Sequence, residues 1–173
     1  MRLRKLALCL RGTPLKKSLG SDFNLGMLES HPQYQIMNFE NLPSNLSSQL
    51  QNLTSGTILL TPDRLKSRHF SILGYRADAL YVETQGGTEM RLPLQAFVRT
   101  LRHMYESGSS AYRPALIRSS NLEPPLGGLC DISRGANGET RWITYILPVL
   151  QYLRWVHVNG AQRPNTAWLA SPA

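Results

Sequence analysis

Three polar residues near the end of the 173-residue chain, Gln151, Arg154 and Arg163, have the chemistry to contact nucleic acid. Gln151 and Arg154 are three residues apart, so in a helix they share one face. In the major groove of DNA, glutamine can pair with adenine and arginine with guanine. Arg163 follows an Asn159-Gly160 turn, where its guanidinium could meet a phosphate or the minor groove. The sequence therefore predicts a nucleic-acid contact in this region.

A second basic group belongs to the stretch from Pro93 to Glu106, which has the clearest helical pattern of the sequence. Its apolar residues recur on one face, and Arg99, Arg102 and His103 lie on the opposite face. We expect these three residues to bind nucleic acid if they share a surface with the C-terminal arginines. The alternative is that they form the ordinary hydrated side of an amphipathic helix.

The N-terminus contains six basic residues and no acid before Asp22. These are Arg2, Arg4, Lys5, Arg11, Lys16 and Lys17. They could extend a basic surface as a flexible arm, because lysine and arginine neutralise phosphates. Two alternatives remain open. One is a first strand at 6–10 flanked by hydrated charges, which is favoured over the other, an organellar transit peptide.

The composition of the chain also favours a nucleic-acid partner. The chain has 19 Lys and Arg against 11 Asp and Glu, a formal charge of +8. This excess favours a polyanionic partner, because neutralising phosphates releases counterions. Hydrophobic residues make up 42%, enough for a core. No apolar run approaches the roughly 18 residues that cross a bilayer, so we expect a soluble, cytoplasmic protein with no membrane partner.

Catalysis is less expected than binding. The four histidines are far apart, and Cys9 and Cys130 fit no zinc motif, so neither a metal nor another cofactor is predicted. Asp78 and the Glu83-Thr84-Gln85 run resemble the acid and E-x-K pattern of metal-dependent nucleases, with glutamine in place of lysine. Residues of opposite strand parity point to opposite faces, which disfavours a joint site for Asp78 and Glu83. A metal-dependent nuclease is the weaker alternative.

The stretch before residue 110 alternates strand and helix patterns. Strands are predicted at 34–39, 57–60, 79–84 and 89–92, the last two joined by Gly86-Gly87. Helices are predicted at 43–53, from Thr61 to Arg68, and at 93–106. Residues 107–138 are rich in loop signals, with one short strand at 115–117.

The C-terminal stretch predicts a helix and a hairpin. Residues 140–147 could be strand or helix, and Pro148 suits a helix start, so we expect a helix at 148–154. Strands at 155–158 and 166–169 should follow. This order resembles the last helix and wing of a winged helix-turn-helix. The resemblance involves Val149-Leu150, Leu153, Trp155-Val156, Gly160 and Trp168-Leu169. It implies a helix near the major groove and a hairpin over the backbone.

The predicted fold is α+β: a small mixed sheet, a central amphipathic helix and a winged-helix-like C-terminal helix plus β-hairpin. The expected parts are a domain at 1–110, a connection at 111–138 and a C-terminal unit at 139–173, with a single domain 1–173 as the alternative. The expected function is nucleic-acid binding without catalysis, DNA being favoured over RNA. The alternative function is an assembly subunit that binds a protein, or a second copy of itself, through the aromatic C-terminal region. For the hairpin, the alternative to a wing is that it simply covers the core, with Arg154 and Arg163 hydrated.

Overall fold

The computed structural model describes residues 40–63, 66–119, 126–134, 140–161 and 163–170. By contacts the chain divides into two compact units, Met1–Gln33 and Tyr34–Ala173, and the described residues belong to the second. The expected strands at 6–10 and 34–39 and the basic N-terminal residues lie outside the described part. The described elements form an α+β fold, as predicted.

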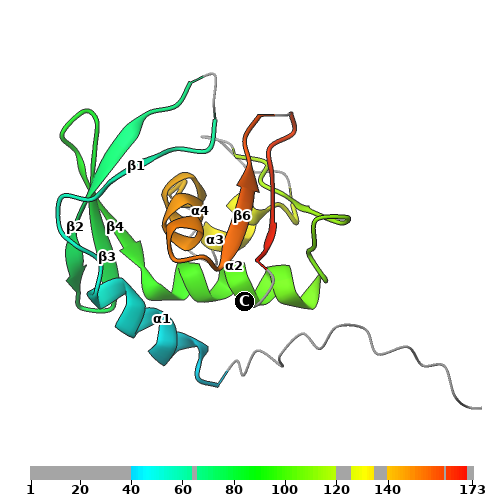
Figure 1. Ribbon diagram of the computed structural model, residues 1–173, viewed down its shortest axis with the longest axis horizontal. Helices are drawn as coiled ribbons and strands as arrows, with labels where there is room; N and C mark the ends of the chain where they lie inside the picture. Colours follow the sequence, from blue (N-terminus) through cyan, green and yellow to red (C-terminus); the bar gives the residue numbers. More distant parts are fainter. Residues whose placement is uncertain (1–39, 64–65, 120–125, 135–139, 162, 171–173) are drawn as a thin grey trace, which may run out of the picture. The chain divides into compact units, whose positions relative to one another are not determined.

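Four antiparallel strands form the first sheet, in the order β1-β2-β3-β4 (Figure 1). Their bounds are Ile58–Leu60 for β1, His69–Arg76 for β2, Ala79–Thr84 for β3 and Glu89–Pro93 for β4. The predicted hairpin around Gly86-Gly87 is confirmed as β3 and β4. Gly87 has a φ of 76°, a conformation that glycine adopts at no steric cost.

The short helix expected from Thr61 to Arg68 is wrong for the residues described there, which connect β1 to β2. The Thr61 hydroxyl accepts a backbone hydrogen bond, as a helix cap would, but its donor is Arg68 N at 3.0 Å. Thr61 N in turn donates to Arg68 O at 2.9 Å, so the pair extends the hairpin. The sequence analysis also missed β2, in which Phe70 and Ile72 alternate inward.

Two predicted helices of the first half are confirmed. The first, α1 (Leu42–Gln51), buries Leu42, Leu46 and Leu50 at helical spacing. The second, α2 (Leu94–Glu106), ends before Gly108, which has a φ of 64°. Its buried apolar residues are Leu94, Ala96, Phe97, Val98, Leu101 and Met104.

The C-terminal helix begins earlier than predicted. It is α4 (Ile143–Tyr152), and Pro148 lies inside it rather than at its start. A proline in a helix interior removes one hydrogen bond and costs about 3 kcal/mol. That cost is offset because most of α4 is buried in the core, including Ile143, Ile146 and Leu147. Tertiary packing has therefore overridden the local signal of the proline.

A second, smaller antiparallel sheet has the order β5-β7-β6, so the single mixed sheet expected from the sequence is replaced by two separate sheets. Its strands are β5 (Ala115–Leu116), β6 (Val156–Asn159) and β7 (Thr166–Leu169). The predicted C-terminal hairpin is confirmed as β6 and β7. The stretch expected to be loop-rich also contains a helix, α3 (Leu129–Arg134), which the sequence analysis missed.

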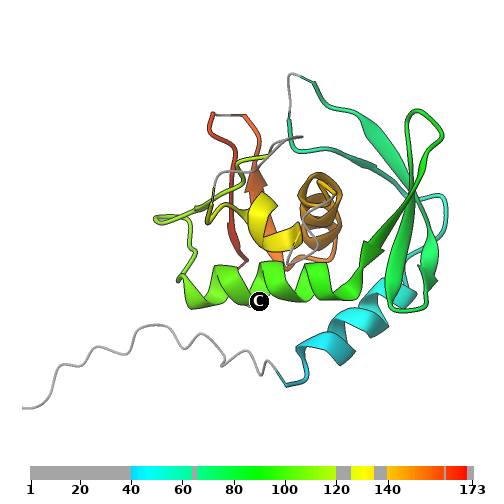
Figure 2. The ribbon, with the colours of Figure 1, turned by 180° about the vertical axis from the view of Figure 1, so that it is seen from behind.

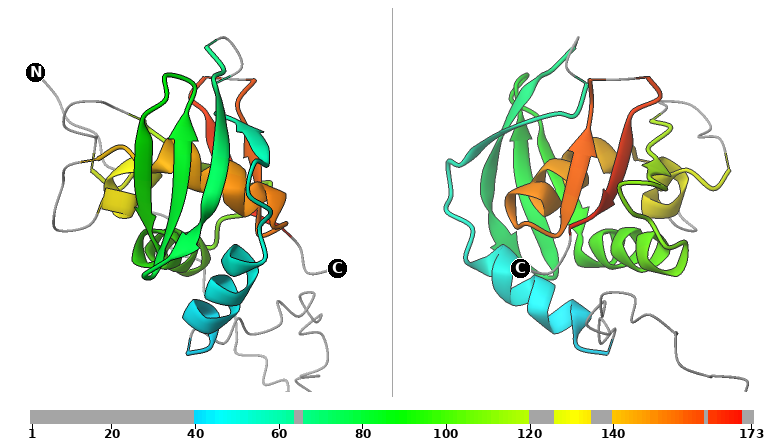
Figure 3. Two further views of the ribbon diagram at one scale, coloured as in Figure 1. Left: turned by 90° about the vertical axis from the view of Figure 1, so that its left-hand side faces the viewer. Right: turned by 45° about the vertical axis from the view of Figure 1, so that its right-hand side comes forward.

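The two sheets share one hydrophobic core with α4 between them (Figure 1). Seen from behind, α3 rests on α2 beside α4 (Figure 2). The first sheet covers the side of α4 that faces away from the second sheet (Figure 3). There the Phe70 and Tyr145 rings meet edge to face with centroids 5.1 Å apart. The expected division at 111–138 stays a prediction.

Candidate nucleic-acid interface

The turn of the β6–β7 hairpin packs on the connection between β1 and β2, so two remote segments lie side by side (Figure 3). A Cβ atom on residue 160 would overlap the Pro62 carbonyl oxygen, so only glycine permits this approach. The Arg163 guanidinium lies 3.5 Å from the Asp63 carboxylate, a pair 100 residues apart in sequence. The hairpin turn and the β1–β2 connection therefore form one surface.

Cations gather at this surface, here called the loop–hairpin tip. Its residues are Pro62, Asp63, Lys66, Arg68, Gly160 and Arg163. Lys66, Arg68 and Arg163 are all exposed. Lys66 N donates to Asp63 O at 3.3 Å, and Arg68 is held by its hydrogen bonds with Thr61. The Lys66 and Arg68 side chains thus project from backbone that is held by hydrogen bonds, and the Arg163 side chain reaches the same surface through its ion pair with Asp63.

The outer face of the hairpin adds an aromatic pair. His157 on β6 and Trp168 on β7 are register partners, and their ring centroids lie 5.6 Å apart. His157 is exposed and Trp168 is half-buried. Rings that lie beside a cationic surface offer a stacking face for nucleic-acid bases.

Gln151 and Arg154 lie at the other end of the hairpin from Arg163. They stand at the C-terminal end of α4, just before β6 begins at Val156, whereas Arg163 follows the turn after Asn159. Gln151 and Arg154 are both exposed. The predicted C-terminal contact residues therefore occupy two separate places, one at the end of α4 and one after the hairpin turn.

The remainder of α4 offers little surface to a groove. Six of its ten residues are buried, and Gln151 and Tyr152 are its exposed residues. The first sheet covers one side of α4 (Figure 3), so that side of the helix is not free to enter a DNA groove. The accessible part of this region is therefore the end of α4 and the hairpin.

The three α2 residues that were predicted to bind nucleic acid, Arg99, Arg102 and His103, have different surroundings. Arg99 donates to the carbonyl oxygens of Ile132 at 3.3 Å and Ser133 at 2.8 Å, which ties α2 to the end of α3. Arg102 is exposed on the next turn. His103 is half-buried and lines a cavity beside β5. Arg113 and Arg118 line the same cavity. They belong to a stretch without helical periodicity, so no pattern in the sequence indicated that they would lie near His103.

The acids considered for a nuclease are separated. Asp78 precedes β3 and Glu83 lies near its other end, so a strand's length divides them. Within the described residues, no group of three or more His, Cys, Asp or Glu side chains is placed to hold a metal ion.

The C-terminal tryptophans pack against the fold. Trp155 Nε1 donates to Gln49 Oε1 on α1 at 2.7 Å, and Trp142 and Trp155 lie against the core. Large apolar side chains are exposed elsewhere, among them Ile58 (66%) and Leu60 (62%) on the edge strand β1.

The chain matches no protein-family model, and no match was found among curated proteins or among solved structures. In the part of the chain that the structure describes, none of the helices has the length and apolar character to traverse a bilayer. The function is therefore inferred from the geometry of the chain itself.

Proposed function

We propose that this protein binds nucleic acid, DNA in preference to RNA, through the loop–hairpin tip and through the end of α4 at the base of the β6–β7 hairpin, without catalysis. The observation that carries the proposal is the junction of Gly160 with Pro62 and of Arg163 with Asp63. This junction unites cations from both halves of the chain on one exposed surface. A surface of this kind attracts phosphates and releases their counterions.

The charge of the tip supports this role. Lys66, Arg68 and Arg163 stand beside a single tip acid, Asp63, which is already engaged with Arg163. The chain as a whole carries +8, so long-range attraction acts in the same direction. Arg154 adds a fourth exposed cation at the base of the hairpin.

The order of elements also supports the proposal. From α2 onwards the chain runs helix, strand, helix, helix, strand, strand, and the strands lie in the order β5-β7-β6. A winged helix-turn-helix combines three helices and three strands in this order. We propose that residues 94–169 form a winged-helix-like unit in which the β6–β7 hairpin is the wing. Because α4 is largely buried, the wing is the main contact and Gln151 with Arg154 a secondary one.

Fluorescence anisotropy of a short labelled DNA duplex tests this proposal. We expect the observed association constant to fall steeply as salt rises from about 50 to 200 mM. The double variant Arg68→Ala/Arg163→Ala should bind at least about tenfold more weakly. Its log–log salt slope should be shallower by about two, since each lost phosphate contact removes roughly 0.9.

The matched control is Arg76→Ala/Arg91→Ala, which removes the same charge from β2 and β4. Arg76 pairs with Glu89 at 3.1 Å and stacks on Tyr81 away from the tip. Equal weakening by the two double variants would mean that only net charge matters and would reject the tip as the site. Absence of binding at low salt would reject nucleic-acid binding altogether.

A second candidate function, protein assembly, is favoured by one observation. β1 is an edge strand that exposes Ile58 and Leu60 and pairs with β2 alone among the described strands. Exposed apolar edges are sites where a partner adds a strand. For this candidate function we propose β1, rather than the C-terminal tryptophans, as the contact surface. Light scattering at several protein concentrations, with Leu60→Lys as the disrupting variant, distinguishes a self-associating chain from a monomer.

A further inference from the structure

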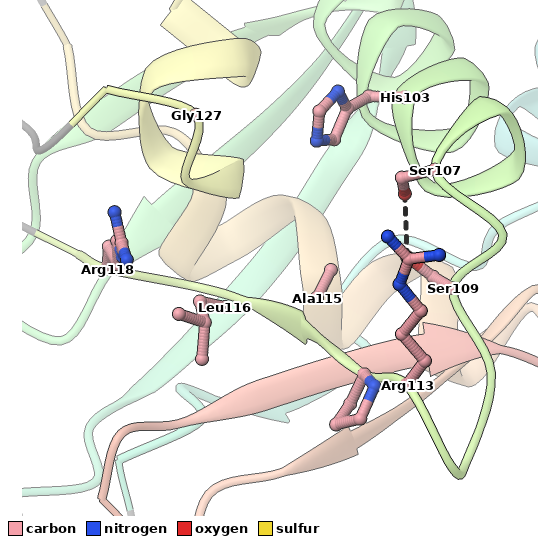
Figure 4. Close-up of a pocket in the computed structure, with 9 residues that line it drawn as sticks. His103, Ser107, Ser109, Arg113, Ala115, Leu116, Arg118 and Gly127 are labelled. Atoms are coloured by element: carbon pink, nitrogen blue, oxygen red, sulfur yellow. Dashed lines mark hydrogen bonds between the residues drawn. The ribbon is translucent and has the colours of Figure 1, made fainter. Parts of the chain in front are cut away.

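We propose that the cavity between the end of α2 and β5 binds the phosphate group of a monoester. The cavity has a volume of about 210 Å³. Drug-sized ligands use roughly 300–1,000 Å³, so the space suits one small polar group with its hydration water. Its polar lining comes from His103, Ser107, Ser109, Arg113, Arg118 and Gly127 (Figure 4).

The charge of the lining selects an anion. Two guanidinium groups and one imidazole contribute to it, and none of its nine residues is an acid. One carboxylate borders the lining, since Asp131 Oδ2 accepts a hydrogen bond from Gly127 N at 3.2 Å, so the cations still outnumber the acids. Within the described part of the chain, neither Arg113 nor Arg118 forms a salt bridge, and Arg118 Nη1 donates to Leu126 O at 3.3 Å. Guanidinium groups match phosphate oxygens in bidentate hydrogen bonds, which favours phosphate over a spherical anion.

Arg113 is held in place by its own loop. Its backbone forms a two-way bridge with Ser110, with both N···O distances at 3.1 Å, and Arg113 N also lies 3.3 Å from Ser110 Oγ. The side chain remains exposed and points toward Ser107 and Ser109 (Figure 4). Its backbone is therefore fixed while its guanidinium stays accessible to a ligand.

Arg118 is held in a conformation that non-glycine residues rarely adopt. Its φ is 45°, in the left-handed region. The preceding residue, Ile117, is buried and bonds Asn165 O on one side and Cys130 N on the other. The Arg118 stem passes directly over Gly128, where a Cβ would lie 2.8 Å from the Arg118 Cβ. Strain that the surroundings maintain in this way is typical of functional sites.

The rim of the cavity is built by the end of α2. Ser109 is 3% exposed, and its hydroxyl lies 3.0 Å from that of Ser107. Because Ser107 Oγ donates to Met104 O at 3.2 Å, Ser109 is the donor between the two hydroxyls. A phosphate entering the cavity would offer the Ser109 proton a stronger, charged acceptor.

Isothermal titration calorimetry with inorganic phosphate tests the cavity directly. We expect saturable binding with Kd on the order of 1 mM. Arg113→Glu should weaken it at least about tenfold. Arg113→Lys, which keeps the charge but loses the bidentate geometry, should weaken it about threefold. The control Arg91→Glu reverses the same charge on β4 and should leave phosphate affinity unchanged.

Two oligonucleotides that differ only in a 5′-phosphate or a 5′-hydroxyl identify the source of the phosphate, with glycerol 3-phosphate as the small monoester. Tighter binding of the 5′-phosphorylated strand, lost in Arg113→Glu, assigns the cavity to a nucleic-acid terminus. Equal binding of both strands, with saturable binding of glycerol 3-phosphate, assigns it to a small phosphorylated molecule. Absence of saturable phosphate binding, or equal loss in Arg91→Glu, overturns the proposal.

The cavity proposal does not depend on the loop–hairpin tip. Inorganic phosphate reports on Arg113 and Arg118, whereas duplex binding reports on Arg68 and Arg163. A chain that binds phosphate but no duplex therefore retains the cavity and loses the proposed nucleic-acid function, and the converse result does the reverse.

Discussion

The C-terminal ends of α2 and α4 are built on the same hydrogen-bond pattern but carry different residues at the same position. At the end of α2, Ser109 N donates to Met104 O at 2.8 Å and Gly108 N donates to Tyr105 O at 2.9 Å. These two bonds form a Schellman motif, in which the residue after the C-cap is usually a left-handed glycine. Gly108 fits that position with a φ of 64°.

At the end of α4, Trp155 N donates to Leu150 O at 2.9 Å and Arg154 N donates to Gln151 O at 3.0 Å. The pattern is again a Schellman motif, but the left-handed residue is Arg154, with a φ of 63°. A side chain in this conformation costs about 1–2 kcal/mol. The end of α2 is relaxed and leads to the cationic cavity, whereas the end of α4 is strained and leads to the hairpin.

The left-handed conformation of Arg154, where α2 has a glycine, therefore lowers the stability of the protein. The φ of Arg154 is fixed by the end of α4 before it and by Trp155 after it. The Trp155 indole is itself held by a hydrogen bond to Gln49. Residues held in rare conformations persist where the surroundings determine them, and they concentrate at functional sites. The strain at Arg154 is therefore an additional reason to include it in the proposed interface.

The largest effect is expected at the loop–hairpin tip and should leave the cavity unaffected. Gly160→Ala should destabilise the protein by about 2–3 kcal/mol, because the new methyl group would collide with backbone at Pro62. It should also weaken duplex binding while leaving phosphate binding at the cavity intact. Chemical denaturation measures the stability change. Gly86→Ala is the control, since its nearest contact would be an ordinary 3.9 Å, and an equal loss there would refute this account.

The next effect tests the relaxed helix end. Gly108→Ala should cost about 1 kcal/mol for conformational reasons alone, because a Cβ at this position meets nothing within 4 Å. Thermal unfolding should show a lower midpoint, and the calorimetric phosphate affinity should fall if Ser107 and Ser109 shift. An unchanged midpoint would show that the left-handed position does not penalise a side chain.

The reciprocal change at the strained end should have the opposite sign. Arg154→Gly should be more stable than Arg154→Ala by about 0.5–1 kcal/mol, since only glycine relieves the left-handed strain. Both variants lose the same charge, so both should weaken duplex binding to the same extent. If the two variants are equally stable by denaturation, Arg154 is not strained and the comparison of the helix ends fails.

The smallest expected effect concerns the salt bridge at the tip. Asp63→Asn should change stability by less than about 1 kcal/mol, because the pair with Arg163 is exposed. Removing a carboxylate from a phosphate-binding surface should strengthen duplex binding by about two- to threefold. Weaker binding in the anisotropy titration would instead show that Asp63 mainly positions Arg163.

Local signals were sufficient for part of this fold. The β3–β4 and β6–β7 hairpins follow from short strand patterns around Gly86-Gly87 and Asn159-Gly160, and α2 follows from its apolar spacing. Each signal lies within one element or one turn. The start of α4 was missed because Pro148 is tolerated through burial, which no local pattern reports.

The candidate sites depend on contacts that sequence spacing does not encode. The approach of Gly160 to Pro62 joins segments of the two halves, and Arg113 and Arg118 line one cavity with His103 although they lie 10 and 15 residues further along the chain. The sequence therefore identified basic residues but not which of them converge. It grouped Arg99 with His103, whereas Arg99 is bonded to α3.

Amide chemical-shift mapping of the isotopically labelled full chain with a short DNA duplex locates the nucleic-acid interface residue by residue. We expect the largest shifts on residues 66–69 and 157–163, with smaller shifts near Arg154. Amides around Arg76 and Arg91 should remain unchanged. Shifts confined to that first-sheet surface, or spread evenly over all exposed cations, would contradict a nucleic-acid interface at the loop–hairpin tip.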